Sequence, residues 1–132
     1  MNTNHTIIRV LDTAGDLPEL PIVEGKGAAK VVMWPGNGAR FRSFHHITLH
    51  EGASTIAQSH PSDCVYYTIQ GVGSVTDVKT ERSFPVEEGA MLHIDAGDTY
   101  RIVADKGASL TVLGGPCPPD EALYNTLKQE GR

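Results

Sequence analysis

Short runs of β-branched and aromatic residues recur along most of the chain. They cover residues 30–34, 64–70, 72–78, 91–95, 99–104 and 109–113, and glycine or proline falls between each run and the next. Short apolar runs punctuated in this way are typical of an all-β sandwich or barrel rather than of alternating strands and helices. The pattern therefore predicts an all-β fold, with an additional first strand at residues 7–11.

The longest alternating run covers residues 40–50. Successive side chains of a strand point to opposite faces, and the more apolar face packs inward. Here the more apolar set is Phe41, Ser43, His45, Ile47 and Leu49. The alternation therefore predicts that His45, a titratable base, points into the core.

The same parity argument applies to the run that starts at Cys64. Tyr66 and Thr68 share the parity of Cys64 and are expected to line one cavity, while Tyr67 and Ile69 point away. After the last predicted strand, Pro118-Pro119-Asp120-Glu121 has the composition of a helix N-terminus. We expect a short helix there, on the outside of the barrel.

Composition and charge exclude several classes of function. The 132 residues suffice for one domain, and no apolar run approaches the ~20 residues that a membrane-spanning helix needs. The net charge is −5, and no basic stripe is present, so a nucleic-acid partner is not expected. The first residues lack the features of an export signal, which predicts a cytoplasmic protein.

Two spaced blocks resemble the conserved motifs of the cupin superfamily. The first is Gly52-x5-Gln58-x-His60-x3-Cys64-x6-Gly71, and the second is Gly89-x5-Asp95-x-Gly97-x2-Tyr100. The resemblance implies a double-stranded β-helix, or jelly-roll barrel, with a short C-terminal helix. It implies an N-terminal arm with the first strand at 1–27, a cupin barrel at 28–115, and a short helix and tail at 116–132. A homodimer is the family expectation.

In cupins, the first motif supplies two histidines and a glutamate to a divalent metal, and the second supplies a further histidine. The corresponding positions here are Gln58, His60, Cys64 and Tyr100. Only His60 is a standard ligand, although a deprotonated Cys64 could bind zinc or iron. The resemblance thus leaves two alternatives: no cofactor, or one divalent ion (Zn, Fe or Ni) on His60, Cys64 and Tyr100.

The segment Phe44-His45-His46-Ile47-Thr48-Leu49 is distantly similar to a strand of ectoine synthase-like cupins. The iron-binding glutamate, tyrosine and histidine of that enzyme would fall on Cys64, Leu92 and Tyr100. None of the three is kept, so the similarity does not carry the activity.

These residues favour an enzyme with non-redox chemistry of lyase, isomerase or cyclase type on a small polar metabolite in the barrel lumen. His60 or His45 would be the base and Tyr100 the acid. The ligand-binding residues would be Gln58, Cys64, Tyr66, Thr68 and Trp34. Two alternatives stay open: a cupin that binds a small ligand without catalysis, and a metal-dependent cupin with an atypical His/Cys/Tyr site.

Overall fold

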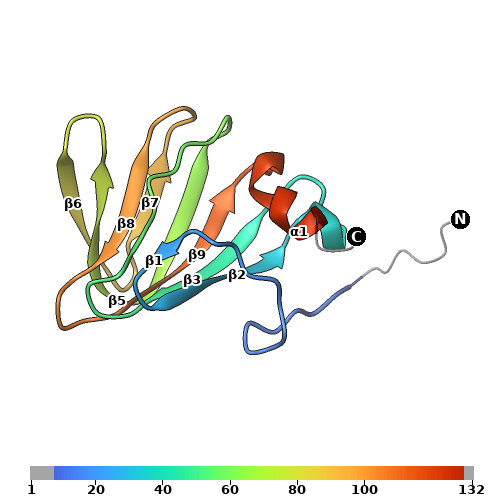
Figure 1. Ribbon diagram of the computed structural model, residues 1–132, viewed down its shortest axis with the longest axis horizontal. Helices are drawn as coiled ribbons and strands as arrows, with labels where there is room; N and C mark the ends of the chain where they lie inside the picture. The colour runs from blue at the N-terminus through green and yellow to red at the C-terminus, as the bar shows by residue number, and fades with distance from the viewer. Residues whose placement is uncertain (1–7, 130–132) are drawn as a thin grey trace, which may run out of the picture.

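The computed structural model describes residues 8–129 and consists mainly of antiparallel strands (Figure 1). Two short 3-10 helices, η1 (Pro35–Asn37) and η2 (Glu121–Tyr124), and one α-helix, α1 (Asn125–Gln129), complete it. None of the helices in this described range is long and apolar enough to cross a membrane. The strands are β1 (Val23–Glu24), β2 (Gly27–Met33), β3 (Phe44–Leu49), β4 (Ser54–Thr55), β5 (Cys64–Asp77), β6 (Arg82–Glu87), β7 (Met91–Ile94), β8 (Tyr100–Ala104) and β9 (Leu110–Pro116).

Strand β5 belongs to two sheets and joins them into a barrel. Its first half pairs with β7 and β9 in sheet A, which continues through β3 to β2. Its second half pairs with β6 and β8 in sheet B, which continues through β4 to β1. The strand changes sheets at Gly71, where φ is +101° and an added Cβ would lie 2.0 Å from the Ser109 carbonyl oxygen. Only glycine fits this turn of the backbone.

The core lies between the two sheets, and strand alternation determines which side chains reach it. His45 in β3 has no exposed surface, and Tyr66 and Thr68 in β5 are buried. Tyr67 and Ile69 are exposed on the outer face of sheet A. The predicted parity of both runs is therefore confirmed.

Three sequence expectations are wrong in detail. Phe41 is 75% exposed, because the chain bends before β3 begins at Phe44. Strand β6 was not expected, since Pro85 lies inside it; a proline is tolerated there because β6 pairs only with β5 and is an edge strand. Residues 8–11 form no strand, and residue 7 of that prediction lies outside the described residues.

The segments that flank the strands close the barrel. Residues 18–20 pair with the edge of β2, through Leu20 N–H to Ala29 O and Val31 N–H to Pro18 O, both 2.8 Å. The C-terminal segment does not stay on the outside as expected. Tyr124 is fully buried and Leu127 is nearly so, and both belong to the core.

Candidate active site

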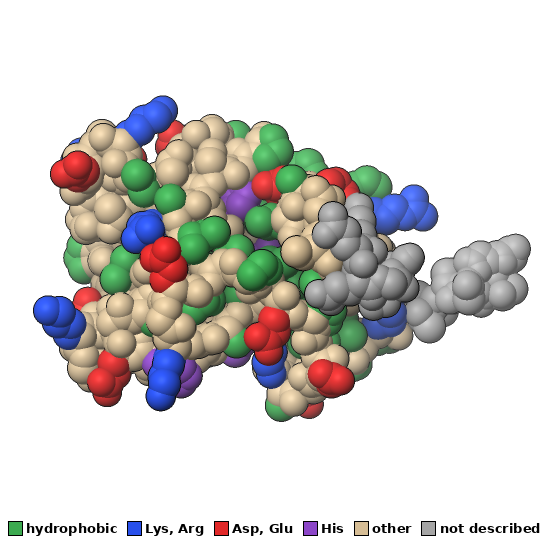
Figure 2. Space-filling model, in the orientation of Figure 1, with side chains coloured by type: hydrophobic (Ala, Val, Ile, Leu, Met, Phe, Trp, Pro, Cys, Tyr) green, Lys and Arg blue, Asp and Glu red, His purple; other side chains and the backbone are tan. Residues whose placement is uncertain are grey.

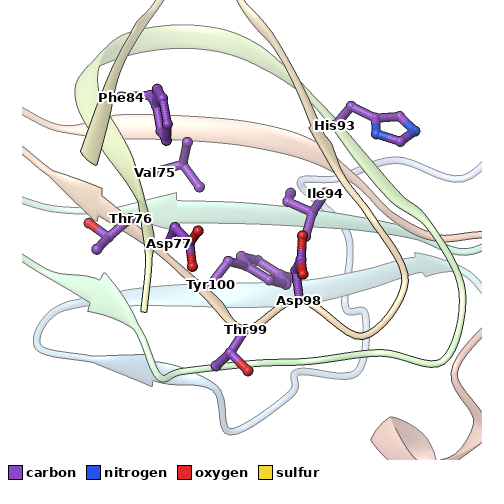
Figure 3. A pocket seen from close by; sticks show the side chains of 9 residues that line it. All are labelled: Val75, Thr76, Asp77, Phe84, His93, Ile94, Asp98, Thr99 and Tyr100. Carbon is purple, nitrogen blue, oxygen red and sulfur yellow. The ribbon is translucent and has the colours of Figure 1, made fainter. Parts of the chain in front are cut away.

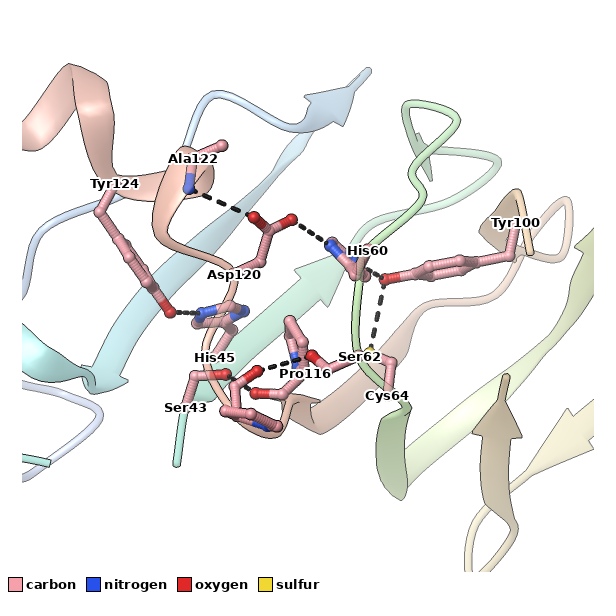
Figure 4. A network of polar contacts seen from close by, with 11 residues as sticks. Ser43, His45, His60, Ser62, Cys64, Tyr100, Pro116, Asp120, Ala122 and Tyr124 are labelled. Carbon is pink, nitrogen blue, oxygen red and sulfur yellow. Dashed lines mark hydrogen bonds and ion pairs between the residues drawn. The ribbon is translucent and has the colours of Figure 1, made fainter. Parts of the chain in front are cut away.

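A chain of hydrogen bonds joins three side chains from distant parts of the sequence (Figure 4). His60 Nδ1 lies 2.8 Å from Asp120 Oδ2, and His60 Nε2 lies 2.8 Å from the Tyr100 hydroxyl. Cys64 Sγ lies 3.6 Å from the same hydroxyl. We call Asp120, His60 and Tyr100 the relay.

The chemistry of the relay members decides which atom donates each hydrogen bond. A carboxylate can only accept, so the N–H of His60 Nδ1 donates to Asp120. In the tautomer with its proton on Nδ1, Nε2 is an acceptor, and the Tyr100 hydroxyl donates to it. The Tyr100 oxygen keeps its lone pairs for the thiol of Cys64 or for a ligand.

The C-terminal segment holds Asp120 in place. Ser62 Oγ donates to Pro118 O at 2.6 Å, and Cys117 N–H donates to Asp63 O at 3.0 Å. Asp120 Oδ1 then accepts a hydrogen bond from Ala122 N–H at 3.2 Å, which caps η2. One carboxylate therefore starts a helix with one oxygen and orients His60 with the other.

Burial keeps the hydroxyl and the thiol of the site protonated. Tyr100 is 2% exposed, and burial, with the nearby Tyr66 and Cys64, raises the pKa of its phenol well above the usual value. Burial also raises the pKa of the Cys64 thiol to about 12, although its hydrogen bond to Tyr100 acts the other way. At neutral pH, Tyr100 is thus protonated and can donate a hydrogen bond, and Cys64 is a weak nucleophile.

Gln58 lies beside Tyr100 through the backbone. Gln58 N–H donates to Tyr100 O and Tyr100 N–H donates to Gln58 O, both at 2.9 Å. The side chain of Gln58 is 7% exposed, and its buried Nε2 has no hydrogen-bond partner within the described structure. Buried polar groups without a partner are rare in proteins.

A second buried histidine, His45, interacts with the relay through His60 and is itself hydrogen-bonded to a tyrosine. His45 Nε2 lies 2.7 Å from the hydroxyl of Tyr124, whose ring packs on Trp34 with centroids 4.8 Å apart. Burial, together with the charge of His60, lowers the pKa of His45 to about 4, so its ring is neutral at pH 7. His45 connects β3 to the C-terminal segment.

A cavity of about 270 Å³, which we call the His60 cavity, opens at one end of the relay. Its polar side chains are Gln58, Ser59, His60 and Asp120. Its larger apolar residues are Ile22, Ile56 and Leu123. On the face shown in Figure 2, histidine and hydrophobic side chains meet beside the C-terminal segment.

A second cavity, of about 150 Å³, is lined by Tyr100 and by residues of β5, β6 and β7. Figure 3 shows the Tyr100 ring between the carboxyl groups of Asp77 and Asp98, with Phe84 and Ile94 above it. We call it the Tyr100 cavity. The relay therefore joins two cavities, with His60 and Asp120 in one wall and Tyr100 in the other.

The side chains at the cupin metal positions do not fit a divalent ion. Both ring nitrogens of His60 already bind protein groups, and the Cys64 and Tyr100 protons are held more tightly than usual. Gln58 offers only a neutral amide. Among residues 8–129, no group of three His, Cys, Asp or Glu side chains is placed to hold a metal.

Four of the residues that the sequence singled out lie together: Gln58, His60, Cys64 and Tyr100. Thr68 and Trp34 line neither of the two cavities, and Tyr66 adjoins the site through its electrostatic interaction with Tyr100 and Cys64. Asp120 was missed as a site residue. Its helix-capping sequence was recognised, but nothing in the local pattern indicated that His60 lies within reach.

Comparisons with known proteins agree with this architecture. No protein-family profile and no curated protein sequence matches the chain. Among solved structures, a cupin-like protein from Thermotoga maritima has a TM-score of 0.70 at 16% identity, over 85% of this chain and 84% of its own. The polyketide cyclase RemF from Streptomyces resistomycificus has a TM-score of 0.70 at 16% identity, over 91% and 94%.

KdgF from Halomonas has a TM-score of 0.66 at 16% identity, over 87% of this chain and 98% of its own. At these identities the likeness establishes the fold and no activity. It agrees with the spacing of the two glycine-bounded blocks and with the sharing of β5 by two antiparallel sheets. The chain therefore has the double-stranded β-helix fold of the small, single-domain cupins.

Proposed function

We propose that this protein is an enzyme that moves protons on a small carbonyl compound without redox change, as an isomerase, lyase or cyclase does. The observation that carries the proposal is the relay, in which a carboxylate, an imidazole and a phenol are joined by two hydrogen bonds of 2.8 Å. A carboxylate that fixes the tautomer of a histidine is a recurrent arrangement in acid–base catalysis. The relay reaches the His60 cavity, where a substrate would bind.

Tyr100 does not line the His60 cavity, so the reaction begins when a substrate in that cavity separates the His60 ring from the Tyr100 hydroxyl. The substrate carbonyl oxygen then takes the Tyr100 hydrogen bond, which frees the lone pair of His60 Nε2. His60 then removes a proton from the carbon next to the carbonyl. The C–H electron pair forms the carbon–carbon double bond, and the carbonyl oxygen receives the Tyr100 proton. The enol so formed is the common intermediate of isomerisation and of β-elimination.

The relay then resets without an outside proton donor. His60, now an imidazolium, passes its Nε2 proton over 2.8 Å to the Tyr100 oxygen. Asp120 stabilises the imidazolium during this step through its hydrogen bond to Nδ1. The net change is one proton from carbon to oxygen, and no electron is gained or lost by the protein.

His60 is a better candidate for the base than His45. Burial lowers the pKa of His45 to about 4, so it is a weak base, and its Nε2 already binds Tyr124. No carboxylate is bonded to His45 among the described contacts. His45 therefore has a positioning role, because it holds the segment that carries Asp120.

The names of structural neighbours support this class of chemistry. RemF is a polyketide cyclase, and another neighbour, from Thermotoga maritima, is a predicted oxalate decarboxylase. Both names describe enzymes, which favours catalysis over simple ligand binding in this fold.

The proposal is tested by proton exchange of acetophenone in deuterium oxide, followed by NMR. Wild-type protein should accelerate the loss of the methyl signal, and His60→Gln or Tyr100→Phe should slow the catalysed exchange by on the order of 10²–10⁴-fold. Tyr67→Phe, on the exposed face of β5, is the matched control and should keep the wild-type rate. Acetophenone that binds without accelerated exchange would refute catalysis and support the binding alternative.

A further inference from the structure

The His60 cavity has a chemical character that restricts what can bind there. Its larger apolar residues, Ile22, Ile56 and Leu123, come from the N-terminal segment, the β4 region and the C-terminal segment. Its polar side chains are Gln58, Ser59, His60 and Asp120. A ligand must therefore present an apolar body to most of the cavity and a polar group to one side.

Gln58 indicates that the polar group of the ligand is a hydrogen-bond acceptor. Its Nε2 is buried without a partner, and the two backbone hydrogen bonds to Tyr100 fix the residue next to the relay. An amide nitrogen is a hydrogen-bond donor only, so the missing partner is an acceptor oxygen. Gln58 and His60 both line the cavity, and Nε2 itself is enclosed, so the Gln58 amide must rotate towards the cavity for a carbonyl oxygen bound there to accept its hydrogen bond.

The charge of the cavity excludes anionic ligands. The described residues that line it include no lysine or arginine, whereas Asp120 contributes a carboxylate. A bound carboxylate or phosphate would have no cation to pair with and would be repelled by Asp120. Charged groups are costly to bury without a partner.

We propose that the site takes uncharged, largely apolar carbonyl compounds and that Gln58 Nε2 donates a hydrogen bond to the carbonyl oxygen. This inference rests on the proposed function, since it names the substrate class of the same site. It differs from the small polar metabolite expected from the sequence, because it names a neutral ketone, aldehyde or ester with an apolar body. Gln58 becomes the residue that determines specificity for the carbonyl group.

Three probes of similar shape test the substrate class by titration followed with NMR of the Gln side-chain amides. Acetophenone has the carbonyl, ethylbenzene lacks it, and benzoate carries a charge. Acetophenone should bind saturably and shift the Gln58 amide signal, and the other two should bind about tenfold more weakly or worse, as expected for one lost hydrogen bond or one unpaired charge.

Substitutions at Gln58 test the role of this residue. Gln58→Leu should weaken acetophenone binding by about tenfold and leave ethylbenzene binding unchanged. Gln70→Leu makes the same replacement at an exposed glutamine of β5 and should have no effect. If Gln58→Leu does not fold, Gln58→Met keeps the length of the side chain, removes both amide donors, and should weaken acetophenone binding equally.

The inference is overturned if benzoate binds as tightly as acetophenone, if acetophenone does not bind saturably, or if a folded Gln58 variant keeps its acetophenone affinity. These outcomes concern binding and not turnover. Selective acetophenone binding without proton exchange would uphold the substrate class while refuting the proposed catalysis.

Discussion

Asp120 Oδ2 lies 2.8 Å from His60 Nδ1, although 60 positions separate the two residues in the chain. His60 lies between β4 and β5, and Asp120 follows the last strand of the barrel. The contact therefore forms only when the C-terminal segment folds back over the open end of the barrel. The orientation of the proposed catalytic base depends on an element outside the two sheets.

Asp120→Asn should separate the orienting role of this residue from its capping role. The amide oxygen can still accept the Ala122 N–H, so η2 should persist. The loss of the carboxylate removes the fixed tautomer of His60 and should lower kcat by on the order of 10²–10⁴-fold with little change in thermal stability. Asp105→Asn, at an exposed aspartate, should leave kcat unchanged. Full activity of Asp120→Asn would rule out the relay.

The stability of the protein should depend on pH through His45. The pKa of His45 is lowered to about 4 in the folded protein from 6.5, so between these values the unfolded chain binds a proton that the folded protein does not. The free energy of unfolding contributed by this group is fully present above pH 6.5 and falls as pH is lowered towards 4, by up to about 3 kcal/mol.

Urea unfolding at about pH 7 and about pH 4.5 measures this dependence. His45→Gln should flatten it. His46→Gln, on the outer face of the same strand, should change it less, because burial lowers the pKa of His46 to a smaller degree. An unchanged pH dependence in His45→Gln would contradict the assignment.

The two cysteines should differ sharply in reactivity. Cys117 is exposed, whereas Cys64 is buried with a thiol pKa of about 12. Ellman's reagent should therefore modify a single thiol in the native protein at neutral pH, and Cys117→Ser should abolish that fast reaction. Rapid modification of Cys64 in folded Cys117→Ser would restore the hypothesis of a nucleophilic cysteine.

Divalent metal should not stabilise the protein through the cupin positions. Because both nitrogens of His60 are engaged and Cys64 holds its proton, added Zn²⁺ or Fe²⁺ is expected to leave the thermal midpoint unchanged. Elemental analysis of protein purified without added metal is the direct measurement. Stoichiometric metal that disappears in His60→Gln would establish the His/Cys/Tyr alternative.

A homodimer remains a prediction from the cupin resemblance. Val65, Tyr67, Ile69 and Met91 are exposed apolar residues on the outer face of sheet A, where a second copy could pack. Light scattering after size-exclusion chromatography should give twice the monomer mass, and Tyr67→Lys should shift it towards the monomer. A monomeric wild-type protein at micromolar concentration would contradict the prediction.

The fold could be predicted because its signals are local. Alternation predicted His45 inside and Tyr67 outside, and the glycine and proline between the runs predicted an all-β sandwich or barrel, which the cupin resemblance specified as a barrel. Phe41 shows the limit of this reasoning, since the alternation in the sequence starts at residue 40 but the strand begins only at Phe44. Pro85 shows another limit, because a proline excludes a central strand but not an edge strand.

Only the site residues that occupy positions of the two cupin-like motifs could be predicted from the sequence. Gln58, His60, Cys64 and Tyr100 occupy motif positions, so the resemblance brought them together before the structure did. Asp120 occupies no motif position. Its contact with His60 depends on the path of the chain after β9, and no periodic pattern encodes that path.

Because Asp120 and Tyr124 follow the last strand, they are added after all the strands during synthesis. The ribosome has made every strand of the barrel before it adds the residues that orient His60 and His45. A nascent chain that has just completed β9 therefore still has both histidines without these partners. A truncated product that stops after β9 would lack the proton-transfer chain and the part of the core that Tyr124 and Leu127 fill.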